Sequence, residues 1–209
     1  MTEHGVALVE LVIGSVRADP GRLLHPYNTW DGPWVAGEPS PVTPPDAFPS
    51  GRPLSPALRR WLEFDAGLLR RFGWFDDGGR LTPRPLAEIA ADAFGPIGKT
   101  YDSPALAERF AECFLLPGGS DSRRVLATGP ADALGEYPVF ALDVDDLPCV
   151  ELMYPGLDVY LAETAGVIEV DRAGKSYSAL KEDARYAQRM REHARGFLNG
   201  EYHEDFTAW

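Results

Sequence analysis

Between residues 55 and 115, hydrophobic residues recur every three or four positions in three segments. Residues 55–72, 82–94 and 103–115 each carry such an apolar stripe, which predicts three amphipathic helices. Each segment begins with a hydroxyl residue followed by proline, a pair that caps a helix and presets its first turn: Ser55-Pro56, Thr82-Pro83 and Ser103-Pro104. Residues 3–17 also favour a helix, although their β-branched content permits a strand.

Beyond residue 124 the apolar period changes from helical to two. Five short runs, at residues 125–128, 138–144, 149–154, 158–162 and 167–170, are separated by Gly, Pro and Asp, which predicts an antiparallel meander. Residues 180–198 then form one long apolar stripe that ends before Gly200, which predicts a terminal helix packed on the sheet. The order of elements indicates an α+β fold: an antiparallel sheet meander flanked by N-terminal helices and a C-terminal helix.

A single domain is expected for residues 1–209. Nine prolines lie between residues 19 and 53, so we interpret 19–53 as a proline-rich wrapping loop, pinned to the body by Trp30 and Trp34, and 54–200 as the core. Residues 202–205 read as a charged tail in solvent.

The formal net charge of −12 argues against binding to nucleic acids or anionic membranes, since both need a cationic patch. No apolar run approaches the length of a membrane span, and the start of the sequence lacks the features of a secretory signal. Cys113 and Cys149 are too few for a disulfide framework and read as reduced thiols, with Cys113 inert on an apolar helix face. These features predict a cytoplasmic protein.

Acidic residues are concentrated in one segment. Residues 125–171 contain no lysine or arginine, whereas proportional use would give about four or five. Ten acids lie within residues 131–171: Asp132, Glu136, Asp143, Asp145, Asp146, Glu151, Asp158, Glu163, Glu169 and Asp171. Repulsion between them must be offset either by arginines of the same chain, such as those of the basic terminal helix, or by a cationic partner.

Two segments resemble the SUKH superfamily of the Smi/Knr type. The stretch RPLSPALRRWLEFDAG (residues 52–67) is similar to the first core helix of that family, and YPVFALDVDD with LDVYLAE is similar to its strand pair. Residues 19–53 have no counterpart in it. The resemblance implies an α+β protein that binds other proteins, typically a bacterial immunity protein that neutralises a toxin, without catalytic residues.

The leading hypothesis is therefore a non-enzymatic module that binds a basic protein, plausibly a toxin or nuclease, through an acidic sheet face. The expected partner-binding residues are Asp143, Asp145, Asp146, Glu151 and Asp158 for charge, with Tyr154 and Tyr160 as aromatic anchors. No catalytic, cofactor or metal residue is predicted, because ligand spacings for zinc and calcium and a phosphate loop are missing from the sequence. The alternatives are a metal-dependent hydrolase or phosphodiesterase that uses Asp143, Asp145 and Asp146, and a subunit that self-associates.

Overall fold

The computed structural model describes residues 4–19, 33–118, 122–144, 148–172 and 176–206. The helices are α1 (Gly5–Ala18), α2 (Pro56–Leu62), α3 (Gly67–Arg71), α4 (Leu86–Phe94), η1 (Gly95–Tyr101), α5 (Pro104–Arg109), α6 (Leu157–Thr164), η2 (Tyr177–Lys181) and α7 (Ala187–Phe197), where η denotes a 3₁₀ helix. The strands are β1 (Cys113–Leu116), β2 (Ser122–Ala127), β3 (Val139–Asp143), β4 (Cys149–Tyr154) and β5 (His203–Asp205). No helix of the described residues is both long and apolar enough to cross a membrane.

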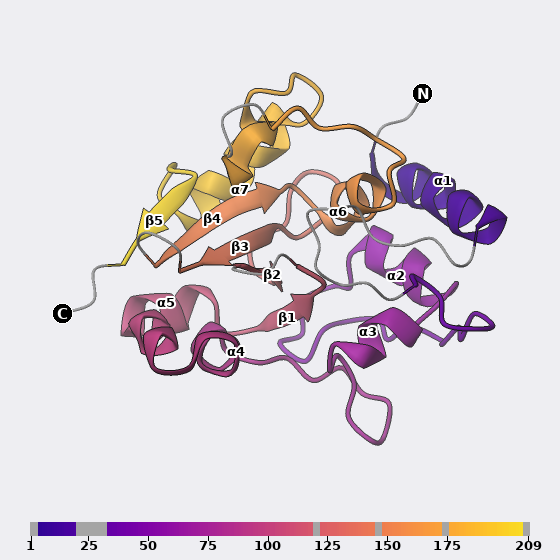
Figure 1. The fold of residues 1–209 in the computed structure, drawn as a ribbon, viewed down its shortest axis with the longest axis horizontal. Helices are drawn as coiled ribbons and strands as arrows, with labels where there is room; N and C mark the ends of the chain where they lie inside the picture. Colours follow the sequence, from indigo (N-terminus) through magenta and orange to yellow (C-terminus); the bar gives the residue numbers. More distant parts are fainter. Residues whose placement is uncertain (1–3, 20–32, 119–121, 145–147, 173–175, 207–209) are drawn as a thin grey trace.

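The five strands form one antiparallel sheet in the order β1-β2-β3-β4-β5 (Figure 1). Strands β1 to β4 follow each other as a meander, and the chain returns through α6 and α7 to add β5 beside β4. Helices precede the sheet, and α7 follows the meander. This arrangement confirms the predicted α+β fold and the meander at residues 139–154.

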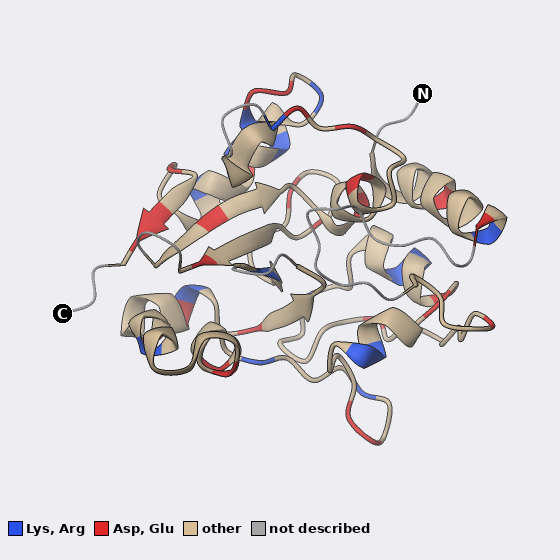
Figure 2. Ribbon diagram, viewed as in Figure 1, with Lys and Arg blue, Asp and Glu red and all other residues tan. Residues whose placement is uncertain are grey.

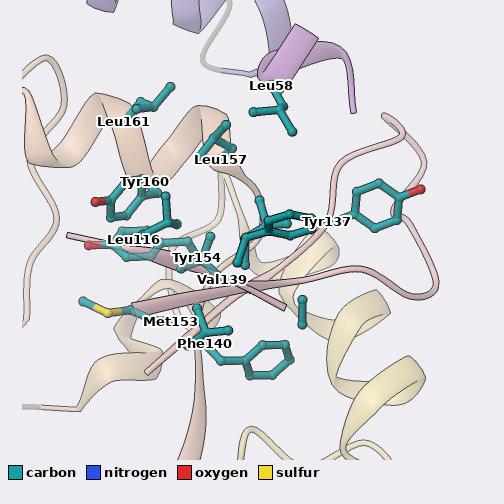
Figure 3. Packing of buried hydrophobic residues seen from close by; sticks show 14 of the residues in the cluster. Leu58, Leu116, Tyr137, Val139, Phe140, Met153, Tyr154, Leu157, Tyr160 and Leu161 are labelled. Carbon is teal, nitrogen blue, oxygen red and sulfur yellow. The ribbon is translucent and has the colours of Figure 1, made fainter. Parts of the chain in front are cut away.

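The apolar core lies on both sides of the sheet. Leu157 and Tyr160 of α6 lie on one side of the strands and Phe140 points to the other (Figure 3). There Phe140 meets Phe110 at 5.0 Å and Phe197 at the end of α7 at 5.2 Å between ring centroids. Helices α6 and α7 both contact β4, the strand that β5 joins.

The core extends beyond residues 54–200. Helix α1, confirmed as a helix, buries five apolar side chains against α2 and α6: Leu8, Val9, Val12, Ile13 and Val16. Trp34 is fully buried and meets Trp61 edge-on at 5.5 Å, so it anchors the segment after residue 33 as predicted. Trp30 lies outside the described residues.

Two of the three predicted hydroxyl caps are confirmed. The side chain of Ser55 accepts a hydrogen bond from Leu58 N at the start of α2, and Ser103 accepts one from Leu106 N at the start of α5. Thr82 does not cap a helix, because α4 begins only after Pro85. The prediction of one helix over residues 55–72 is wrong, because the chain forms two helices, α2 and α3. Asp65 lies between them, and its carboxylate accepts hydrogen bonds from Ser40 N and from Leu68 N in α3.

Several predicted elements differ in type. Residues 113–116 are strand β1 and not the end of a helix, because they pair with β2 and gain backbone hydrogen bonds there. Residues 158–162 belong to helix α6 and not to a strand, and residues 167–170 are not a strand. All eight residues of α6 are buried, so its hydrophobic pattern carries no helical period. Residues 203–205 form β5 and not a solvent tail, and the terminal helix is divided into η2 and α7.

Candidate functional site

The two tyrosines predicted as partner anchors lie inside the protein. Tyr154 and Tyr160 are 3% and 0% exposed, and their rings meet edge-on at 5.5 Å between centroids. The Tyr160 hydroxyl donates a hydrogen bond to the carbonyl of Pro117 at 2.9 Å, and the guanidinium of Arg172 lies 5.3 Å above the Tyr154 ring. Burial raises the pKa of both phenols. The expectation that they contact a partner is therefore wrong for this conformation.

Asp158 is likewise an internal residue. It is 0% exposed in the first turn of α6, and Arg189 of α7 donates to both of its carboxylate oxygens, at 2.9 and 3.1 Å. The backbone N–H of Gly5 adds a third hydrogen bond at 2.6 Å. Its negative charge is matched within the chain, which corrects its prediction as a partner-binding residue.

Glu151 and Asp143 lie on the polar face of the sheet, next to the segment that leads into η2. The Glu151 carboxylate accepts hydrogen bonds from Ser176 Oγ and Ser178 N, both at 2.8 Å. Burial, together with a hydrogen bond to Asp143, raises the pKa of the Tyr177 hydroxyl. This segment therefore covers Glu151 on the face that was predicted to meet a partner and leaves Asp143 half-buried, and Asp145 and Asp146 lie outside the described residues.

Arginines of the same chain neutralise further members of the acidic segment. Glu163 forms a two-point ion pair with Arg172, at 2.9 and 2.6 Å, and Asp132 accepts a hydrogen bond from Arg189 Nε at 2.5 Å. Of the two explanations for the segregated charge, the internal one holds for Asp132, Asp158 and Glu163. Sequence order separates these acids from the arginines that the fold brings to them.

Arg189 is the centre of a buried ionic network, which we define as Asp132, Glu136, Asp158, Arg189 and His193. Its members are at most 7% exposed. Burial alone would raise the pKa of Asp132, but hydrogen bonds from His193 and Arg189 hold that pKa at about 2. Nε2 of His193 lies 2.9 Å from the carbonyl of Pro155. The network joins α6, α7 and the segment between β2 and β3.

Glu136 differs from the other carboxylates of the network. Burial and the neighbouring charge of Asp158 raise its pKa to about 8, although Ala57 N donates to one of its oxygens at 2.8 Å. Its second oxygen is buried and has no hydrogen-bond partner among the described residues. A shifted carboxyl group can mark a catalytic site. Here the surroundings are closed, since a methyl group on Gly156 would come within 2.9 Å of the Glu136 side chain and 2.5 Å of Arg189, which indicates a structural role.

Two acids of the sheet, the half-buried Asp143 and the exposed Asp205, lie at one end of it. Asp143 of β3 pairs in register with Cys149 of β4, and Cys149 pairs with Asp205 of β5. We call these three residues the acidic sheet end; Figure 2 shows acidic residues in red at this end of β3 and on β5. Burial, followed by the charges of Asp143, Glu151 and Asp205, raises the pKa of the Cys149 thiol to about 12.

Asp205 was missed by sequence reasoning because residues 202–205 were interpreted as a tail. A signal was present: Tyr202 and Phe206 stand on either side of the acids at an even spacing, and both rings pack against the core. That alternation is typical of a short strand with one buried face. Arg109 fixes the strand further by a two-point ion pair with Glu204, at 2.7 and 2.9 Å.

Neither reactive thiols nor a metal cluster emerges from the geometry. Cys113 lies on β1 and not on a helix, but it is 0% exposed and burial raises its pKa, as expected for an inert thiol. Among the residues that the structure describes, no three His, Cys, Asp or Glu side chains are placed to hold a metal ion. Two of the three aspartates of the hydrolase hypothesis are outside that part of the chain.

Comparison with known proteins supports the fold alone. No protein-family model and no curated protein matches the sequence. A crystal structure of an uncharacterized protein from Salmonella enterica subsp. enterica serovar typhimurium is similar over 94% of both chains, with a TM-score of 0.53 and 12% sequence identity. The arrangement of helices and sheet is thus shared with a solved structure, and the SUKH resemblance stays a prediction.

Proposed function

We propose that this protein is a non-enzymatic binding module that neutralises a basic protein, as the SUKH resemblance implies for bacterial immunity proteins. Because Asp158, Tyr154 and Tyr160 are buried, we locate the proposed contact surface at the acidic sheet end. The proposal keeps Asp143 from the predicted contact residues and adds Asp205. A toxin that acts on polyanions carries a basic cleft, which is complementary to such a surface.

The register of β3, β4 and β5 is the observation that supports this proposal. It places the carboxylates of Asp143 and Asp205 on the two strands that flank β4, one on either side of Cys149, two strand spacings (about 10 Å) apart, where like charges repel each other. The Asp205 side chain remains 50% exposed. A cationic partner would relieve this repulsion and would associate faster because of it.

The position of β5 makes this surface accessible. It is the last strand in the sheet order, and His203 and Asp205 are both exposed. Short, charged edge strands resist unwanted pairing with other sheets. Recognition here would therefore depend on side-chain charge, so it should weaken as salt is added.

The test measures association with a basic toxin encoded beside the gene of this protein. Asp143→Asn combined with Asp205→Asn should lower the association rate by about tenfold at low salt and flatten its salt dependence, because charge steering acts on the encounter. The matched control is Asp77→Asn, which removes an exposed carboxylate from the loop between α3 and α4, far from β5 (Figure 1).

The control should leave the rate unchanged. If the double variant also associates at the wild-type rate, or if no basic protein encoded nearby binds, the acidic sheet end is not the contact surface. Circular dichroism of each variant confirms that the comparison is made between folded proteins.

A further inference from the structure

The outer face of α1 is apolar although it faces solvent. Ala7, Leu11, Gly14 and Ala18 are all exposed and follow one another at spacings of four, three and four residues, which places them in one line on the side opposite the buried residues of the helix. Leu11 is 46% exposed, and Val6, which lies away from the line on the flank of Glu10, is 40% exposed. A surface helix normally carries polar residues there.

Gly14 adds a second feature to this face. Glycine in a helix interior is less stable than alanine by roughly 0.5–1 kcal/mol. A methyl group at Gly14 would meet no atom of the described residues within 4 Å, so no contact with that part of the chain requires glycine at this position. Glycine does permit the side chain or backbone of another molecule to approach the helix closely.

We propose that α1 packs antiparallel against α1 of a second copy of this protein, about a twofold axis that passes between Leu11 and Gly14. In that arrangement Leu11 lies over the partner's Gly14, and Ala7 lies beside the partner's Ala18. A large residue then enters the space left by a small one, twice, as knobs-into-holes packing requires. The line becomes the centre of a small, self-complementary interface.

The charges beside the line select a second copy as the occupant. Glu10 and Arg17 lie on the same flank of the line, seven residues apart, and both are exposed. A twofold axis brings the same flank of both helices together, so Glu10 faces the partner's Arg17 and Arg17 faces the partner's Glu10. A parallel pair would place Glu10 near the partner's Ser15 and form neither contact.

Both charged side chains are already held in place within the chain. Glu10 accepts hydrogen bonds from Arg60 at 2.5 and 3.2 Å, and the guanidinium of Arg17 lies 5.2 Å above the ring of Phe64. Side chains fixed before association lose less conformational entropy on binding. The helix and the acidic sheet end lie at opposite ends of the molecule (Figure 1), so this inference is independent of the proposed function.

The first experiment is sedimentation equilibrium of the full chain over a wide range of concentrations. The wild type should dimerise reversibly, and Leu11→Glu should raise the dimer dissociation constant at least about tenfold by burying a charge at the centre of the interface. Ile97→Glu is the matched control, because Ile97 is 52% exposed on η1 and outside the proposed contact. It should leave the dissociation constant unchanged.

The second experiment tests the antiparallel arrangement. Glu10→Lys and Arg17→Glu should each weaken self-association, because each places like charges opposite one another. An equimolar mixture of the two variants should form a heterodimer, in which both charge pairs are restored. The Glu10→Lys variant lacks the contact with Arg60 in the mixture as well. Recovery of association in the mixture therefore reports contacts between chains.

Three results would overturn the proposal. One is a wild type that stays monomeric at the highest concentration, and another is a Leu11→Glu variant that dimerises like the wild type. The third is a mixture of the charge variants that associates no better than either alone. Circular dichroism on every variant separates loss of dimer from loss of fold.

Discussion

Two groups of aspartates meet opposite environments in this protein. In the buried ionic network, Asp132 and Asp158 are within hydrogen-bonding distance of Arg189 and are hidden from water. At the acidic sheet end, Asp143 and Asp205 lie beside Cys149 near the edge of the sheet, and Asp205 is exposed. The same residue type is therefore paired with arginine inside the protein in one region and contributes charge to the surface in the other.

The difference shows why segregation of charge along a chain does not by itself locate a binding surface. Arg189 lies 57 residues from Asp132 in sequence and 31 from Asp158, yet it contacts both. A buried pair contributes little net stability but becomes costly when one partner is removed. Exposed carboxylates carry no such cost, so the two regions should respond very differently to mutation.

The largest effect is expected for Arg189→Met. The variant leaves Asp132 and Asp158 buried without their common partner, which should lower the free energy of unfolding by about 3–5 kcal/mol. Urea denaturation at neutral pH measures this loss. The matched control is Arg191→Met on the exposed side of the same helix, which should change the free energy of unfolding by less than about 0.5 kcal/mol.

Equal stability of the two arginine variants would show that the network is not a structural element. A smaller loss for Arg189→Met, accompanied by a raised pKa of Asp132 in NMR titration, would show that this carboxylate takes up a proton in place of the lost cation. That outcome would still assign the pairing to Arg189.

A pH dependence of intermediate size is expected from Glu136. Its pKa in the folded protein, about 8, is above its ordinary value of 4.5, so the folded state holds this proton more tightly than the unfolded chain. The stabilisation is complete below about pH 4.5 and is lost as the pH rises through 8. The free energy of unfolding of the wild type should fall by about 2–4 kcal/mol between pH 5 and 8.5. Glu136→Gln has the shape of the protonated carboxyl group and no titrating proton, so this fall should be absent from the variant.

Asp132 provides the opposite sign within the same network. Its folded pKa of about 2 lies below the ordinary 3.8, so its stabilisation is present above pH 3.8 and is lost as the pH falls towards 2. Asp132→Asn should therefore flatten the acid limb of the stability curve and leave the limb above pH 5 unchanged in slope. A Glu136→Gln variant with the wild-type slope between pH 5 and 8.5 would contradict the assignment of the raised pKa.

Local signals in the sequence identified those parts of the fold that depend on local chemistry. Ser55 and Ser103 cap their helices with their own side chains, and β4 begins with a period of two because buried Val150 and Leu152 alternate with half-buried Cys149 and Glu151. Helix α6 and strand β1 were not recognised. All residues of α6 are buried and the residues of β1 are all apolar, so neither shows the periodicity on which the prediction depends.

The candidate site was predictable only in part. Asp143 could be placed at a strand end from its neighbours in sequence, whereas Asp205 reaches the same place through a strand added from the end of the chain. The burial of Tyr154 and Tyr160 follows from the packing of α6, which no local pattern shows. Contacts between distant segments, and not composition, decide which acids are exposed.

The smallest expected effect concerns Cys149 at the acidic sheet end. Burial and three carboxylates hold its pKa at about 12, so removal of the Asp205 charge should lower that pKa and enlarge the thiolate fraction at a given pH. In Asp205→Asn, alkylation of Cys149 by iodoacetamide at pH 9 should be about two- to fivefold faster, because a nearby exposed charge shifts a pKa by a few tenths of a unit. Asp77→Asn should leave the rate unchanged, and mass spectrometry of the labelled peptide separates Cys149 from the buried Cys113. An unchanged rate in Asp205→Asn would place that carboxylate too far from the thiol to share one charged surface with it, and the acidic sheet end would then reduce to Asp143 alone.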